Sequence, residues 1–143
     1  MKHVIATILL CLPWLSYGMI NRKDFSENQL ERIDSIHQIC KHTTGVSETL
    51  INQMIKGGFP EDLKAKRYSY CLWMVYMEMD DNLDLDVKHM WNFLPHIHKR
   101  DVHIYMQCND EIKKLPGNDL VEKMWQMQKC AQGRVDPEHY LFF

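Results

Sequence analysis

Four widely separated cysteines constrain the fold of this chain more than any other feature of its sequence. Cys40, Cys71, Cys108 and Cys130 follow one another at gaps of 31, 37 and 22 residues. In an oxidising compartment an even number of cysteines pairs into disulfides, and four cysteines allow three pairings. A zinc site is the alternative use, but zinc sites usually draw on close pairs such as C-x-x-C, which this chain lacks. The spacing therefore favours a small domain stapled by two disulfides.

The N-terminus indicates the compartment. Basic residues at the very start precede an apolar run over residues 4–14, and small residues follow it. This order is the signature of a secretory signal peptide, and so short an apolar run cannot span a membrane. We therefore expect residues 1–18 to be a cleaved signal peptide that takes Cys11 with it. Residues 19–143 are then one secreted, extracellular domain without stable membrane insertion.

Composition and motifs argue against several classes of function. The chain carries 19 acidic and 17 basic residues, a formal net charge of −2, and lacks the basic excess that nucleic acids attract. It contains no nucleophile elbow, phosphate-binding loop or HExxH pair, so we expect no enzymatic activity. Three histidines, His96, His98 and His103, suggest a metal site. They fall in an expected polar connection beside Lys99 and Arg100, whose charges oppose a cation, so we expect neither a metal nor another cofactor. A pH-sensitive hinge suits these histidines better.

Turn signals divide the domain into segments with helical spacing, which predicts an all-α fold, a compact bundle of about six helices. Ser26 with Gln29 three residues later forms a capping box before the first helix, and Ser47 caps the second. Asp101 and Asn118 are the expected caps of the fifth and sixth helices. The expected helices cover about residues 27–43, 48–56, 62–79, 85–94, 102–112 and 119–132.

The cysteines and the residues around them resemble the insect odorant-binding proteins, whose members have six helices and six cysteines. Cys40 lies at the end of the first expected helix, as the family's first cysteine does, and the G-G-F-P run at 57–60 is similar to the segment that follows it. Residues 67–71, R-Y-S-Y-C, look like the family's C-Y-x-x-C with arginine in place of the leading cysteine. Cys108 and Cys130 fall where the fourth and sixth cysteines belong.

Two cysteines of the family pattern are missing. Arg67 stands at the second cysteine position, and Val121, at the family's spacing before the last cysteine, stands at the fifth. These two cysteines bond to each other in six-cysteine members, so their joint absence resembles the four-cysteine Minus-C subgroup. The resemblance then implies the disulfides Cys40–Cys71 and Cys108–Cys130.

The resemblance also implies a function, namely a secreted carrier that binds small hydrophobic molecules, such as odorants or pheromones, in an internal apolar pocket. The many methionines and aromatic residues of the helices suit such a pocket, because methionine adapts to several shapes. Tyr76 and Tyr105 are the candidates for a polar contact with the ligand. Helical periodicity gives the expected ligand-binding residues: Ile33, Met54, Leu72, Trp73, Tyr76, Met79, Trp91, Leu94, Tyr105, Met106, Met124, Met127 and Phe142.

Further expectations concern the C-terminal tail and the partners. The chain ends in four apolar residues, 140–143, which would fold back as a lid over the cavity mouth because their surface needs cover. A chemosensory receptor is a candidate partner, and the expected state is a monomer or a weak homodimer. The alternative function is that of a secreted helical effector or signalling protein, which acts on a partner surface without an internal ligand.

Overall fold

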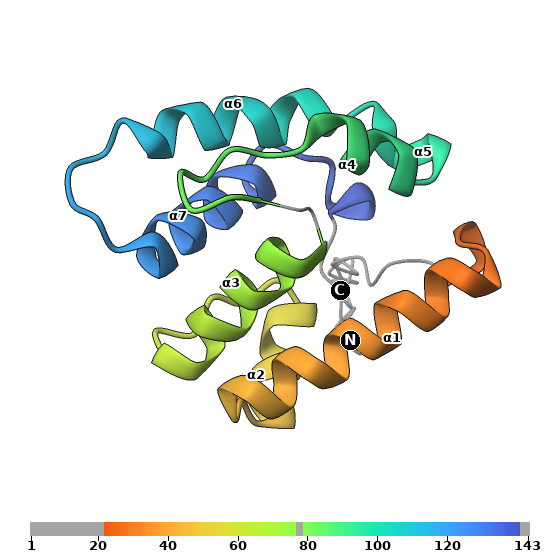
Figure 1. Ribbon diagram of the computed structural model, residues 1–143, viewed down its shortest axis with the longest axis horizontal. Coiled ribbons are helices and arrows are strands. Elements are labelled where there is room, and N and C mark those ends of the chain that lie inside the picture. Colours follow the sequence, from red (N-terminus) through yellow and green to blue (C-terminus); the bar gives the residue numbers. More distant parts are fainter. Residues whose placement is uncertain (1–21, 77–78, 141–143) are drawn as a thin grey trace, which may run out of the picture.

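The computed structural model describes residues 22–76 and 79–140, and these residues contain helices and connecting segments but no strand (Figure 1). Two short 3-10 helices, η1 (Arg22–Asp24) and η2 (Pro137–His139), stand at the two ends. Between them lie the α-helices α1 (Glu27–Thr44), α2 (Glu48–Ile55), α3 (Leu63–Tyr76), α4 (Val87–Phe93), α5 (His96–Lys99), α6 (Val102–Lys113) and α7 (Leu120–Gln132). The all-α prediction is confirmed, with one short helix more than expected. The expected signal peptide, residues 1–18, lies outside the described residues.

The first two helices begin where their capping residues predict. The Ser26 hydroxyl accepts a hydrogen bond from the backbone N–H of Gln29, and the Gln29 side chain accepts one from the backbone N–H of Ser26. The Ser47 hydroxyl accepts from the backbone N–H of Leu50 in the same way. Gly45 ends α1 in the left-handed conformation, with φ of 63°, which glycine adopts without strain. These signals are local, so the sequence predicts them well.

Two helix starts differ from the prediction. Asp119, and not Asn118, caps α7, its carboxylate accepting from the backbone N–H of Glu122. Asp101 stands at the start of α6 as expected, but its side chain makes no capping hydrogen bond, because its carboxylate faces His139 instead. Asparagine and aspartate cap about equally well, so a shift by one residue costs little local energy.

The helices contact one another in a spatial order that differs from their order along the chain. The main contacts join α1 to α3, α3 to α7, α7 to α6, and α6 to α4 (Figure 1). The Cys40–Cys71 disulfide links α1 to α3, and the Cys108–Cys130 disulfide links α6 to α7, so the predicted pairing is confirmed. α3 therefore lies between the two covalently linked pairs.

The contact between α3 and α7 is held by polar side chains. The Lys66 ammonium lies 2.7 Å from the Glu122 carboxylate. Lys129 on α7 reaches Glu61, just before α3, at 2.6 Å. Deeper in the contact, the Ser69 hydroxyl donates a hydrogen bond to the side-chain oxygen of Gln128. Among the described residues this contact carries no disulfide.

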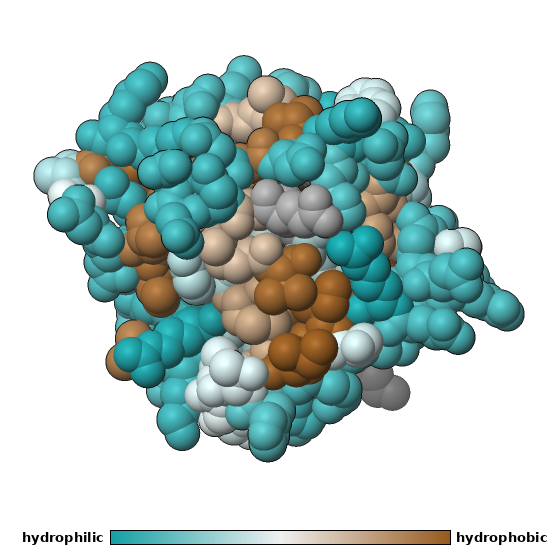
Figure 2. All heavy atoms as spheres, viewed as in Figure 1, coloured by the Kyte–Doolittle hydropathy of each residue, from teal (hydrophilic) through white to brown (hydrophobic). Residues whose placement is uncertain are grey.

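The face shown in Figure 2 is mostly hydrophilic, with a group of apolar side chains near its middle. They lie over the region between α1 and α3. Ile39 on α1 and Val75 on α3 are among the large apolar side chains that the structure leaves exposed. None of the described helices is both long and apolar enough to cross a membrane.

Candidate functional site

The candidate site is the apolar interior, which α3 crosses. Leu72, Trp73 and Tyr76 share one face of α3 because their spacing follows the helical repeat, and all three are buried. Met124 and Met127 on α7 are buried as well. Large, adaptable side chains from neighbouring helices thus meet in one core.

Aromatic rings organise one side of this interior. The Trp73 and Tyr105 ring centroids lie 5.6 Å apart, joining α3 to α6. Tyr76 meets Phe93 of α4 edge to face, with 4.7 Å between the centroids. Phe93 in turn lies 6.0 Å from Phe25, which precedes α1. Edge-to-face and tilted pairs of this kind are the favoured aromatic geometries.

Most of the residues predicted to contact a ligand lie in this interior. They come from five helices and from the segments that follow α3 and α4, and each is no more than 6 % exposed: Ile33, Met54, Leu72, Trp73, Tyr76, Met79, Leu94, Tyr105, Met124 and Met127. Phe142 lies outside the described residues, as do residues 141 and 143 of the expected lid. Tyr140, the first residue of that tail, is buried.

Two predicted site residues lie on the surface, and for them the prediction of an interior position is wrong. Trp91 is 50 % exposed, with the Lys99 ammonium 5.6 Å from its ring centroid, and Met106 is 39 % exposed. Each follows a buried residue, Met90 and Tyr105, so the helical rotation of about 100° per residue turns it away from the core. The spacing of apolar residues fitted two faces of each helix, and packing selects one.

Sequence reasoning missed several residues of this interior. Phe93 and Met90 form the buried face of α4, and Phe25, which lies outside any α-helix, packs against the ring of Phe93. The Gln29 side chain donates a hydrogen bond to the backbone carbonyl of Phe93 at 2.6 Å, which fixes the end of α4 against the start of α1. The spacing of Met90, Phe93 and Leu94 was the available signal for this face.

The tyrosine hydroxyls of the interior stay neutral. Burial raises the pKa of Tyr76 far above its usual range. Burial likewise raises the pKa of Tyr140, although a hydrogen bond with the Gln128 side chain acts in the opposite direction. Neutral hydroxyls can orient a ligand without the desolvation cost of a charge.

His98 is the largest departure from the sequence reading. The expected polar connection is instead the helix α5, and His98 is only 4 % exposed. Its ring lies 6.2 Å from that of His139, and His139 Nδ1 lies 3.0 Å from a carboxylate oxygen of the buried Asp101. Burial lowers the pKa of His98. The backbone of His139 and the charges of Asp24 and Asp101 oppose this lowering, whereas the charge of the His139 side chain adds to it. The imidazole is therefore neutral at neutral pH.

Acidification is expected to destabilise the fold through His98. The folded chain keeps this imidazole neutral, whereas the unfolded chain takes up a proton near the ordinary pKa of 6.5. The free energy of unfolding should therefore fall as the pH drops below about 6.5, and His98→Phe should remove part of that fall. His37, whose pKa burial also lowers, supplies another part. Urea denaturation between about pH 5 and pH 7 measures the effect.

The control for this experiment is His103→Phe, because His103 is exposed on α6. This variant should keep the pH profile of the original protein. A profile that His98→Phe leaves unchanged would contradict the assignment.

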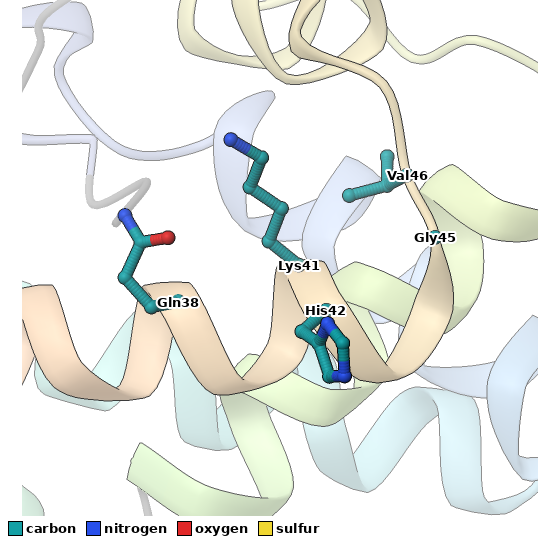
Figure 3. A pocket seen from close by; sticks show the side chains of 5 residues that line it. All are labelled: Gln38, Lys41, His42, Gly45 and Val46. Atoms are coloured by element: carbon teal, nitrogen blue, oxygen red, sulfur yellow. The ribbon is translucent and has the colours of Figure 1, made fainter.

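A separate hollow of about 330 Å³ lies on the surface at the C-terminal end of α1. Gln38 and Lys41 extend from one side of the helix, His42 points to another, and Gly45 and Val46 complete the lining from the connecting segment (Figure 3). Lys41 pairs with Glu48 across the turn. The polar lining does not suit an apolar ligand, so the interior remains the candidate site.

No group of three or more His, Cys, Asp or Glu side chains within residues 22–76 and 79–140 is placed to hold a metal ion. His98 and His103, which the sequence places close together, face different surroundings: the first is buried beside Phe25, and the second is exposed.

Comparisons with known proteins agree with this arrangement of helices. A model of the PBP/GOBP family matches residues 22–133, most of the chain. Among solved structures, the chain is similar to Apis mellifera odorant binding protein 5, with 20% sequence identity and a TM-score of 0.61. That match covers 82% of this chain and 98% of the other. At so low an identity the structural likeness shows a shared fold.

Proposed function

Because the chain belongs to the PBP/GOBP family of insect odorant-binding proteins, which are binding proteins and not enzymes, we propose that it carries odorants, pheromones or similar small apolar molecules in an internal pocket. The observation that carries the proposal is the interior built from Trp73, Tyr76, Tyr105 and the buried methionines. Rings give a ligand a large apolar contact area, and methionines adapt to its shape. The Apis mellifera protein of similar fold is by name an odorant-binding protein.

Binding would draw chiefly on the removal of the ligand's apolar surface from water. Each square ångström so buried contributes roughly 25 cal/mol, of which the costs of association take a part. We propose the ten buried residues of the predicted set as ligand contacts, together with Phe25, Met90 and Phe93. Trp91 and Met106 are left out because they are exposed.

We also propose that the chain is a four-cysteine, Minus-C member of its family. The two disulfides of the described residues and the non-cysteine residues at positions 67 and 121 support this assignment. The remaining cysteine, Cys11, lies outside the described residues, in the segment that we propose as a cleaved signal peptide. On this proposal the mature protein is secreted, and a chemosensory receptor is the partner to which it delivers its ligand.

Displacement of a fluorescent apolar probe tests the carrier function. We expect N-phenyl-naphthylamine to bind the folded, oxidised protein, and medium-chain alcohols or terpenoids to displace it with micromolar dissociation constants. Met124→Trp should weaken binding because it fills the interior, where Met124 is fully buried.

The matched control is Met106→Trp, which adds the same bulk to an exposed methionine and should leave the affinity unchanged. Circular dichroism establishes that both variants keep their helices. Absence of probe binding in the folded protein would instead favour a helical effector that acts through its surface.

A further inference from the structure

His98 stands at the end of a continuous row of buried rings. Its ring is stacked on Phe25, with 6.2 Å between the centroids and 28° between the planes. From Phe25 the row continues to Phe93 and then to Tyr76, which lies on α3. All four side chains are at most 7 % exposed. The row thus runs from α5 to α3 and places one imidazole at the end of a series of buried aromatic rings.

The imidazole of His98 makes no hydrogen bond of good geometry, although the backbone of His139 is close enough to oppose the lowering of its pKa by burial. Neither ring nitrogen has a well-aligned partner among the described residues, although the side chain is only 4 % exposed. Buried polar groups without partners are rare in native proteins, because each one loses its bonds to water without replacement. The nearby carboxylate of Asp101 does not supply the bond, since it pairs with His139. A hydroxyl group of a bound molecule would supply a well-aligned hydrogen bond to this imidazole.

We propose that His98 binds the hydroxyl group of an apolar alcohol whose hydrocarbon part lies along the rings of Phe25, Phe93 and Tyr76. This inference rests on the proposed carrier function and adds the ligand class and the residue that selects it. The sequence alone predicts a polar contact from Tyr76 or Tyr105 instead.

The charges around His98 favour an alcohol over an acid or an amine. A neutral imidazole has one donor and one acceptor, and a hydroxyl group both donates and accepts. A carboxylate would be repelled by Asp24 and Asp101, whose charges reach His98. An ammonium group would lose its hydration in an interior where the imidazole offers it a single acceptor.

A pair of ligands that differ only in the hydroxyl group tests the inference. Dodecanol and dodecyl chloride have the same hydrocarbon chain, and only the alcohol can form the two hydrogen bonds. Competition against N-phenyl-naphthylamine, with the oxidised mature chain, gives both affinities. We expect the alcohol to bind roughly three- to tenfold more tightly, the scale of one net hydrogen bond.

Three variants assign that preference to a residue. His98→Phe keeps a ring in the row and should make the two ligands bind equally. His98→Gln keeps a donor and an acceptor and should retain part of the preference. Tyr105→Phe removes the hydroxyl of the alternative polar contact and should retain the full preference for dodecanol over dodecyl chloride.

The outcomes separate this inference from the carrier function. If neither ligand displaces the probe from the original protein, the carrier function fails. If both bind and His98→Phe keeps the preference for the alcohol, the carrier function stands and the role of His98 is wrong. Should His98→Phe not fold, the ring nitrogen resonances of His98 in the original protein decide. They should shift with dodecanol and not with dodecyl chloride, and equal behaviour with both ligands overturns the inference.

Discussion

Truncation of Phe93 to alanine is expected to lower the free energy of unfolding by about 3 to 5 kcal/mol, the usual cost of emptying a buried phenylalanine site. The Phe93 side chain is 7 % exposed and contacts the rings of Phe25 and Tyr76. Its loss would therefore leave a cavity that two further rings cannot fill. Urea denaturation of the oxidised protein at neutral pH measures the change.

Trp91→Ala is the matched control, two residues earlier on the same helix. Trp91 is 50 % exposed, and the Lys99 ammonium lies over its ring. Truncation there should cost about 1 kcal/mol or less, although tryptophan is the larger side chain. Equal losses at the two positions, or a larger loss at Trp91, would show that α4 presents a different face to the core.

The contrast between Phe93 and Trp91 explains what the sequence could predict of the site. Helical spacing on α3 and α7 identified buried residues correctly, because long amphipathic helices leave one apolar face. α4 is only two turns long, and both of its candidate faces are apolar. The orientation of α4 is set by packing against α6 and by the hydrogen bond from Gln29 to Phe93. Neither contact can be predicted from the residues of α4 alone.

His98 shows the same limit for a polar residue. Its neighbours Lys99 and Arg100 make the segment look exposed, and Arg100 is in fact exposed. The burial of His98 depends on Phe25 and on His139, which come from the two ends of the described chain. A contact between such distant segments exists only once the helices have packed, so spacing and charge alone could not predict it.

The prediction of the helices followed from local signals, whereas the pairing of the four cysteines followed from the family resemblance. Capping residues fixed the starts of α1 and α2, and Pro95 ended α4 near the predicted residue. The two disulfides fixed which helices are linked. What the cysteines did not indicate is how α3 is held against α7, where the structure has the ion pair of Lys66 with Glu122.

A third disulfide at that contact is expected to raise the stability of the fold. Lys66 and Glu122 adjoin Arg67 and Val121, the two positions where the proposed family alignment places bonded cysteines. The double replacement Arg67→Cys with Val121→Cys would close a loop of about 55 residues, which the chain-entropy model values at roughly 4 kcal/mol, less any strain. The melting temperature should rise by roughly ten degrees or more, as calorimetry would measure.

The bond should also change ligand selection, because it ties α3, which carries Trp73 and Tyr76, to α7, which carries Met124 and Met127. We expect the range of ligand sizes that displace the probe to narrow, while the affinity of the best ligand stays nearly the same. Arg67→Cys alone provides the control, since it removes the same arginine without forming the loop. It should neither raise the melting temperature nor narrow the range of ligand sizes. Two free thiols in the folded double variant, or oxidation only between molecules, would show that positions 67 and 121 are not neighbours. The assignment of the two missing cysteines, and with it the Minus-C proposal, would then fail, while the family membership of the chain would stand.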